Sequence, residues 1–234
     1  MLRVTSLKKT VGSFSLSIDK LEIQSPGIYG LIGPNGCGKS TTAKLIGGIL
    51  TPDAGIIDIS MNSRDITMIT QKPYIMDDTV YNNLEYPMRL RGIKNRGSLC
   101  EEYLGRIGFL ERRNQRARGL SGGERQKLAL LRAMIFKPRL IIADEAMTAL
   151  DIDSLDFYEK FIIEEQKKDP IIWLFISHQM PQIKRLFSYI FFMYQGRIEA
   201  EGKTEDVFNS VSNLHLKQYL KAYDSINLHT DNTD

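Results

Sequence analysis

The spacing of hydrophobic and polar residues divides the chain into three stretches. In the first, residues 2–7 and 13–18 carry β-rich sequence with alternating side chains, which is typical of strands with one buried face. Short apolar or β-rich runs bounded by turn residues follow at 28–32, 56–59 and 66–69. The pattern predicts an antiparallel β region at the N-terminus that leads into a parallel core.

The second stretch, from about 72 to 136, has hydrophobic residues at helical spacing. Residues 80–90 and 99–107 fit helices, and the basic, glycine-containing segment 91–97 separates them. We therefore expect an α-helical subdomain inserted into the sheet domain.

In the third stretch, apolar runs alternate with helical segments. The predicted strands are 140–144, 171–177, 189–194 and 197–201, and the predicted helices are about 154–168 and 180–187. This alternation indicates an α/β fold with a mainly parallel sheet covered on both faces. Trp173 lies in the middle of a predicted strand and is expected in the core. We expect one domain over residues 1–223 and a flexible, polar tail over 224–234.

A phosphate-binding motif lies between the apolar run 28–32 and a predicted helix. The stretch fits the pattern G-x-x-x-x-G-K-[ST] at every fixed position, and it comprises Gly33, Pro34, Asn35, Gly36, Cys37, Gly38, Lys39, Ser40 and Thr41. Glycines let the backbone N–H groups wrap a polyphosphate, and the helix N-terminus adds a partial positive charge. Lys39 is predicted to neutralise the β- and γ-phosphates, and the Ser40 hydroxyl to bind Mg²⁺. The motif predicts a nucleotide-binding protein with a P-loop NTPase fold.

Composition limits the partners and the cellular location that this protein can have. A net charge of +3 is too small to predict a nucleic-acid partner. Cys37 and Cys100 lack the spacing of a metal site, and Cys37 lies inside the phosphate loop, so we expect no disulfide framework and a reducing compartment. Cys37 is interpreted as a small packing side chain. The N-terminus has no signal-peptide pattern, and the longest apolar runs fall short of the ~20 residues that span a bilayer. We expect a cytoplasmic protein that lies peripherally on the inner face of the cell membrane.

A second motif, Leu-Ser-Gly-Gly-Glu-Arg-Gln at 120–126, precedes a run with helical spacing. Ser121, Gly122 and Gly123 would begin a helix and present donors and the helix dipole to an anion. With both motifs in this order, the chain resembles the ATP-binding cassette (ABC) family from the phosphate loop to about Gly202. The resemblance implies that the anion is the γ-phosphate of ATP held by a second subunit, so that two subunits form a head-to-tail dimer. That dimer is a homodimer or a pair of different ABC subunits.

Two adjacent carboxylates end the apolar strand 140–144. Asp144 is placed to reach the Mg²⁺ beside Ser40, which resembles the Walker B element of the family. Glu145 is then placed to polarise the attacking water as a general base.

Three further residues match the family's pattern. Gln71 resembles the glutamine loop, which in the family contacts Mg²⁺ and water and hinges the helical lobe. Asp151 resembles the loop that communicates across the dimer, and His178 resembles the switch histidine that contacts the γ-phosphate. His215 and His229 receive no role.

The sequence does not identify the residue that stacks on the nucleotide base. The family commonly places an aromatic residue upstream of the phosphate loop, where this chain has Val11. Phe14 could substitute, but core packing explains it as well. Either ATP or GTP therefore fits the sequence.

Two functions fit the motifs. The first is an ATP-hydrolysing subunit that energises an ABC transporter through dimer closure, docked on an integral membrane subunit near Gln71, Tyr74, Ile75 and Met76. The segment 81–92 resembles bacterial importer subunits, although small exporter systems share it. The second is a soluble ABC ATPase that serves as an assembly module, of the kind found in iron–sulfur cluster assembly. ATP and Mg²⁺ are the expected cofactors in both.

Overall fold

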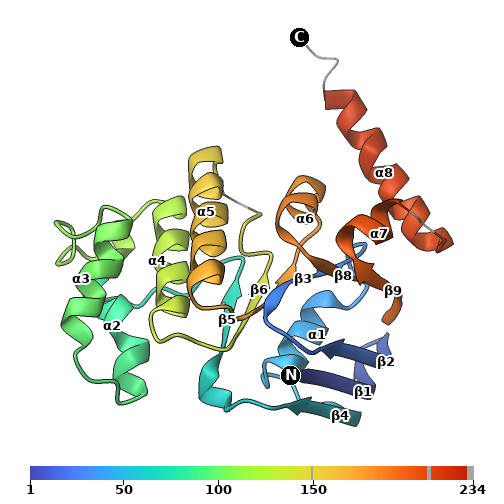
Figure 1. Cartoon of the computed structure of the whole chain (residues 1–234), viewed down its shortest axis with the longest axis horizontal. Coiled ribbons are helices and arrows are strands. Elements are labelled where there is room, and N and C mark those ends of the chain that lie inside the picture. The colour runs from blue at the N-terminus through green and yellow to red at the C-terminus, as the bar shows by residue number, and fades with distance from the viewer. Residues whose placement is uncertain (149, 210–211, 231–234) are drawn as a thin grey trace. The chain divides into compact units, whose positions relative to one another are not determined.

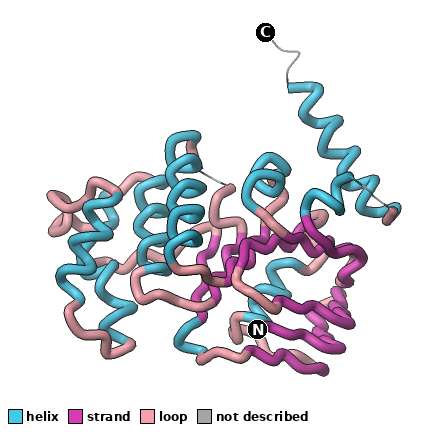
Figure 2. Tube along the Cα trace, in the orientation of Figure 1, coloured by secondary structure: helices cyan, strands magenta, loops and turns pink. Residues whose placement is uncertain are grey.

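A computed structural model describes residues 1–148, 150–209 and 212–230, with side chains described up to residue 222. The chain divides into two compact units, which are described separately. The terminal unit comprises Met1–Ser60 and Ile172–Asp234, and the middle unit comprises Met61–Ile171. Figure 1 labels their elements, and Figure 2 distinguishes helices from strands.

The terminal unit begins with an antiparallel sheet. β1 (Leu2–Val11) pairs with β2 (Phe14–Ile23) on one side and with β4 (Ala54–Ile59) on the other. The inward-facing residues of β1 and β2, such as Leu2, Val4 and Ile18, are buried, as the alternating pattern predicts. The predicted antiparallel β region is thus confirmed.

A set of mainly parallel strands forms the rest of this unit's sheet structure. β3 (Gly27–Ile32) lies between β7 (Ile172–Ile176) and β8 (Tyr189–Tyr194), parallel to both, and β9 (Arg197–Lys203) pairs antiparallel with β8. β3, β7 and β8 are continuous apolar runs, as expected for parallel strands buried on both faces. Trp173 is fully buried and stacks on Phe175, which confirms that it belongs to the core.

Four helices belong to the terminal unit: α1 (Lys39–Ile46), α6 (Met180–Leu186), α7 (Thr204–Asn209) and α8 (Leu214–Thr230). The sequence patterns do not predict α7 or α8. α8 carries Tyr219, whose ring packs 5.6 Å from that of Phe192. Residues 224–230 belong to this helix, whereas 231–234 of the predicted tail lie outside the described residues. The tail's flexibility stays a prediction.

The middle unit combines two parallel strands with four α-helices. β5 (Ile66–Thr70) pairs with β6 (Leu140–Asp144), and a short 3-10 helix (Ser63–Asp65) precedes β5. The helices are α2 (Val80–Leu90), α3 (Arg96–Arg106), α4 (Gly122–Met134) and α5 (Ile152–Lys168), and a second 3-10 helix (Ala117–Gly119) precedes α4. α2, α3 and α4 fall within the range predicted for the helical subdomain.

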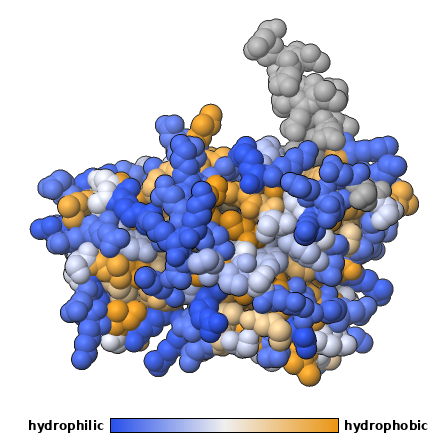
Figure 3. Space-filling model, in the orientation of Figure 1, coloured by the Kyte–Doolittle hydropathy of each residue, from blue (hydrophilic) through white to orange (hydrophobic). Residues whose placement is uncertain are grey.

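The α/β fold class is confirmed by these elements. None of the helices among the described residues is long and apolar enough to span a lipid bilayer. On the face drawn in Figure 3, hydrophilic side chains predominate and hydrophobic residues occur in small groups.

Candidate functional site

The predicted phosphate loop connects β3 to α1 in the terminal unit. Gly33 has a φ of 147°, and a Cβ placed there would lie 2.1 Å from the carbonyl oxygen of Met193, so only glycine fits. Gly38, with a φ of 109°, is the N-cap of α1, and no described side chain caps this helix. The helix N-terminus therefore faces the loop with its partial positive charge, an arrangement suited to a phosphate group.

Lys39 holds the loop together from within. Its Nζ donates hydrogen bonds of 2.8 Å to the carbonyl oxygen of Gly33 and 2.9 Å to that of Pro34, and the residue is only 6% exposed. Its ammonium group thus places a positive charge at the position where the motif predicts phosphate. Burial raises the pKa of the neighbouring Cys37 thiol, which favours a packing role for this cysteine over a redox switch.

A cavity of about 440 Å³ lies beside the loop, lined by residues 13–15, 34–37, 194 and 195. Phe14 packs under the loop, because a Cβ on Gly38 would meet its ring at 2.9 Å. Tyr194, which sequence reasoning missed, lines the cavity and stacks on His215 with 4.0 Å between ring centroids. The His215 Nδ1 in turn lies 2.7 Å from a Glu199 carboxylate oxygen. Only the fold brings Tyr194 to the loop, since it lies at the end of β8.

His178 follows β7 in the same unit. Because Leu31 of β3 pairs in parallel with Ile176 of β7, the residues after both strands leave the sheet at the same edge. The phosphate loop and His178 therefore lie at one edge of the terminal unit's sheet. The turn after β7 is held by a hydrogen bond of 3.1 Å from the Gln179 backbone N–H to Ser177 Oγ.

Gln71, Asp144 and Glu145 lie together in the middle unit. Thr70 of β5 pairs with Asp144 of β6, so Gln71 and Glu145 both follow the carboxyl ends of adjacent parallel strands. Glu145 has a φ of 51°, a left-handed conformation that is uncommon for a residue with a side chain and that clusters at functional sites. The two carboxylates and the amide thus share one edge of this strand pair.

The donor chemistry of three predicted metal-binding residues fits Mg²⁺. Ser40 offers a hydroxyl oxygen, Asp144 a carboxylate and Gln71 an amide oxygen, all of them hard ligands of the kind that Mg²⁺ prefers. Ser40 belongs to the terminal unit, and the other two residues belong to the middle unit.

The segment after Gln71 is tied to α4. The Gln126 side chain donates a hydrogen bond of 2.6 Å to the backbone carbonyl of Gln71. Arg132, six residues further along α4, donates one of 2.6 Å to the carbonyl of Tyr74, a residue that is 76% exposed. Tyr74 is thus held by its backbone and presents its side chain outward.

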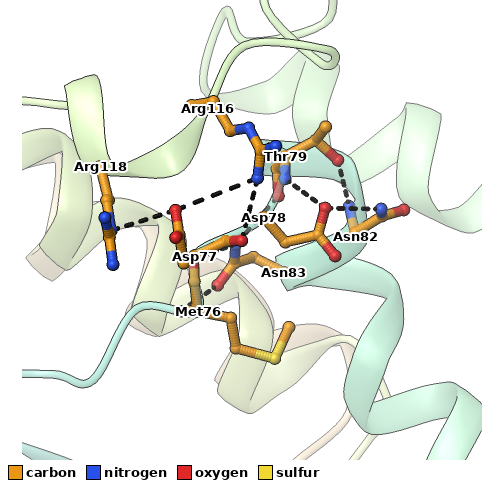
Figure 4. A network of polar contacts seen from close by, with 8 residues as sticks. All are labelled: Met76, Asp77, Asp78, Thr79, Asn82, Asn83, Arg116 and Arg118. Carbon is orange, nitrogen blue, oxygen red and sulfur yellow. Dashed lines mark hydrogen bonds and ion pairs between the residues drawn. The ribbon is translucent and has the colours of Figure 1, made fainter.

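A network of polar contacts fixes the next residues of this segment (Figure 4). The buried Asn83 side chain accepts a hydrogen bond from the Met76 backbone N–H at 2.9 Å and donates one to its carbonyl at 3.1 Å. Arg118 forms an ion pair of 3.0 Å with Asp77, and Arg116 donates to the Asp77 carbonyl. The network joins the segment before α2 to the segment before the Leu-Ser-Gly-Gly motif, a link that sequence reasoning missed because its partners are about 40 residues apart.

Ser121 begins α4 with a reciprocal cap. Its Oγ accepts a hydrogen bond of 3.3 Å from the Glu124 backbone N–H, and the Glu124 carboxylate accepts one of 2.8 Å from the Ser121 N–H. Hydrogen bonding to Arg112 and to the Ser121 backbone lowers the pKa of Glu124 to about 2. The predicted helix N-terminus at Ser121 is therefore present, exposed and well ordered by local contacts.

Asp151 lies close to this motif, at the N-cap of α5. Its carboxylate accepts a hydrogen bond of 2.7 Å from the Ser154 backbone N–H, and this contact holds the pKa of Asp151 below its usual value. Gly123 of α4 lies directly against Ser154 and Asp151. The middle unit thus brings together the starts of two helices that carry predicted site residues. Ala149, in the preceding loop, lies outside the described residues.

Comparison with known proteins places these observations in a family. A family profile described as ABC transporter matches residues 16–148. The tungstate uptake system ATP-binding protein TupC of Peptoclostridium acidaminophilum is 38% identical over 210 residues, which cover 86% of this chain and 98% of TupC. The phosphate import ATP-binding protein PstB of Saccharolobus solfataricus is 29% identical over 224 residues, with 86% of each chain covered. The methionine import ATP-binding protein MetN 2 of Enterococcus faecalis is 28% identical, covering 86% of this chain and 63% of that protein.

A solved structure supports the fold. The dimeric structure of a post-hydrolysis state of the ATP-binding cassette MJ0796, bound to ADP and Pi, matches with a TM-score of 0.75. The match covers 87% of this chain and 99% of that one at 23% sequence identity, and it bears on the fold alone.

Proposed function

The chain belongs to the ABC transporter family and is an ATP hydrolase of that family, and we propose that it is the nucleotide-binding subunit that energises an importer. The observation that carries the proposal is the 38% identity to a tungstate uptake subunit over 98% of that protein's length. Two further relatives are named as import ATP-binding proteins for phosphate and methionine. Because two of the three names contain an oxyanion, a tetrahedral oxyanion is the first substrate class to test.

In the proposed mechanism, two copies close head to tail around ATP. Residues 33–41 of one copy bind the phosphates, with Lys39 neutralising their charge. Ser121 of the second copy contacts the γ-phosphate of the same ATP. Glu145 accepts a proton from the attacking water, and His178 contacts the γ-phosphate. Ser40, Asp144 and Gln71 are the residues that would hold Mg²⁺, and the ion would supply charge neutralisation at the phosphate oxygens. Hydrolysis then reopens the dimer.

The proposed partner is an integral membrane subunit, on which this chain docks at the inner face of the cell membrane. Tyr74 is the proposed contact residue, since this residue is 76% exposed while its backbone carbonyl is hydrogen-bonded by Arg132. Ile75 and Met76 follow it in the same segment. The exposed aromatic ring on a rigid backbone suits an interface, because a large side chain is buried there with little loss of conformational freedom.

The proposal is tested by purifying the tagged chain from its own cells in a mild detergent and identifying the proteins that accompany it. A multi-span membrane protein in comparable amount is the expected result, and Tyr74→Ala should reduce its recovery while ATP binding by the chain is retained. Companions that are soluble only, with ATPase activity unaffected by membranes, would favour the assembly-module function instead.

A further inference from the structure

Gln182 is a buried polar residue of α6 that the proposed mechanism does not use. It is 2% exposed, although glutamine side chains mostly lie at the surface. Its Oε1 accepts a hydrogen bond of 3.4 Å from the Ser177 hydroxyl, whereas its Nε2 has no hydrogen-bond partner among the described residues. An apolar side chain of similar size would fill the same space without a buried, unpaired donor, so packing alone does not explain an amide here.

The partner of this amide, Ser177, lies immediately before His178. Ser177 is 4% exposed, and its Oγ also accepts a hydrogen bond of 3.1 Å from the Gln179 backbone N–H. The Ile183 backbone N–H of α6 donates a hydrogen bond of 3.1 Å to the Gln179 carbonyl. The two residues that flank His178 are therefore joined to each other and to α6.

The Gln182 amide sets the direction in which the Ser177 hydroxyl points. A serine hydroxyl carries one hydrogen and rotates to bring it to an acceptor. While that hydrogen points to Gln182 Oε1, the lone pairs of the oxygen are available to the Gln179 N–H. Without this acceptor the hydrogen rotates toward other acceptors, and the hydrogen bond that closes the turn around His178 becomes weaker.

We propose that Gln182 is a positioning residue, which orients the Ser177 hydroxyl and thereby fixes the turn that carries His178. The unpaired Nε2 is a consequence of placing an acceptor at this point, because an amide brings a donor with its acceptor. The inference rests on the proposed function, in which His178 contacts the γ-phosphate. Gln182 acts on the reaction through Ser177 rather than by contact with ATP.

Two substitutions at this position separate the acceptor from the size of the side chain. Gln182→Leu removes the acceptor, and we expect kcat for ATP to fall by about fivefold to tenfold while KM stays within about twofold of the wild type. The reason is that the phosphate loop still binds ATP while His178 is misplaced. Gln182→Glu should keep kcat within about threefold of the wild type, because a carboxyl group accepts the Ser177 hydroxyl in either protonation state.

Amide hydrogen exchange reports on the turn itself, independently of ATP hydrolysis. The Gln179 N–H should exchange at least about tenfold faster in Gln182→Leu and at the wild-type rate in Gln182→Glu, because its hydrogen bond depends on the Ser177 hydroxyl. An unchanged exchange rate in Gln182→Leu would overturn the inference. Faster exchange with an unchanged kcat would overturn it as well, since the turn would then be loosened without effect on the reaction.

Ser177→Ala tests the same contact from its other side, because it removes the hydroxyl on which Gln182 acts. Adding Gln182→Leu to Ser177→Ala should lower kcat by no more than about twofold further, since the two residues form one contact. A further loss as large as that of Gln182→Leu alone would contradict the inference. If Gln182→Leu does not fold, Gln182→Met replaces it with the same expected results, because methionine is unbranched and lacks a strong acceptor.

Two controls complete the design. Ile183→Val removes one buried carbon from the same helix, so Tm should fall while kcat is unchanged, which separates a loss of stability in α6 from a loss of turnover. His178→Ala should lower turnover more than any variant of Gln182. Full turnover in His178→Ala would contradict the proposed function, and the exchange rate of the Gln179 N–H would then decide the role of Gln182 by itself.

Discussion

Ser121 has a structural role and a proposed functional role that different substitutions separate. Its Oγ caps α4 by accepting the Glu124 N–H at 3.3 Å, and the same exposed helix start is proposed to meet the γ-phosphate of ATP on the second copy. Alanine removes the cap. Asparagine and aspartate are both strong N-cap residues of nearly equal size, but only aspartate carries a negative charge.

The expected magnitudes follow from these contacts. Loss of the cap in Ser121→Ala should lower the free energy of unfolding by about 1 kcal/mol, or roughly 2–4 °C in Tm for a chain of this size. Ser121→Asn and Ser121→Asp should remain near the wild type in stability. An aspartate about 4 Å from a phosphate charge would experience a repulsion on the order of 4 kcal/mol at an effective dielectric constant near 20. Ser121→Asp should therefore lose roughly 10²–10³-fold in kcat/KM relative to Ser121→Asn.

The assay pairs thermal unfolding, followed by circular dichroism, with steady-state phosphate release for all three variants. Equal turnover of the aspartate and asparagine variants would refute the placement of Ser121 against phosphate. A Ser121→Ala variant as stable as the wild type would instead show that the cap makes no measurable contribution to the free energy of unfolding, although both of its hydrogen bonds are present.

Three further outcomes are expected. Lys39→Ala should weaken ATP binding, measured with a fluorescent analogue, by at least about tenfold, and tight binding by this variant would contradict the loop's role. Glu145→Gln should lower turnover by roughly 10²–10⁴-fold while sparing nucleotide binding, and near-normal turnover would remove Glu145 as the general base. Hydrogen bonding to Arg112 lowers the pKa of Glu124 from 4.5 to about 2. The contribution of the ionised Glu124 to the stability of the folded protein is therefore fully present above pH 4.5 and is lost as the pH falls toward 2. Tm should accordingly fall more steeply over that range in the wild type than in Arg112→Gln, and equal slopes would contradict this linkage.

Local patterns in the sequence determined much of the fold. The predicted segments 80–90, 140–144 and 189–194 coincide with α2, β6 and β8, because each has a strong periodicity or an unbroken apolar run bounded by turn residues. The phosphate loop was recognisable for the same reason, since every group that it needs lies within nine consecutive residues. The cap of α4 is equally local, because its two partners, Ser121 and Glu124, lie only three residues apart in the chain.

The sequence patterns did not predict α7 and α8, because the packing of these helices depends on residues that are far away in the chain. α8 is polar along much of its length, and its aromatic contact to Phe192 joins residues that are far apart in the chain. The same holds for Tyr194, which lines the cavity beside the phosphate loop and stacks on His215 only because β8 and α8 meet in the terminal unit. No local pattern encodes such a pairing.

The sequence by itself thus predicts which residues bind phosphate and metal, while the tertiary structure decided what surrounds each of them. Gly122 and Gly123 are identical in sequence terms, yet one lies beneath open space and the other against the cap of α5. The physical reason is that backbone propensities and caps act over a few residues, whereas crowding and burial arise between segments whose distance along the chain does not set their distance in space.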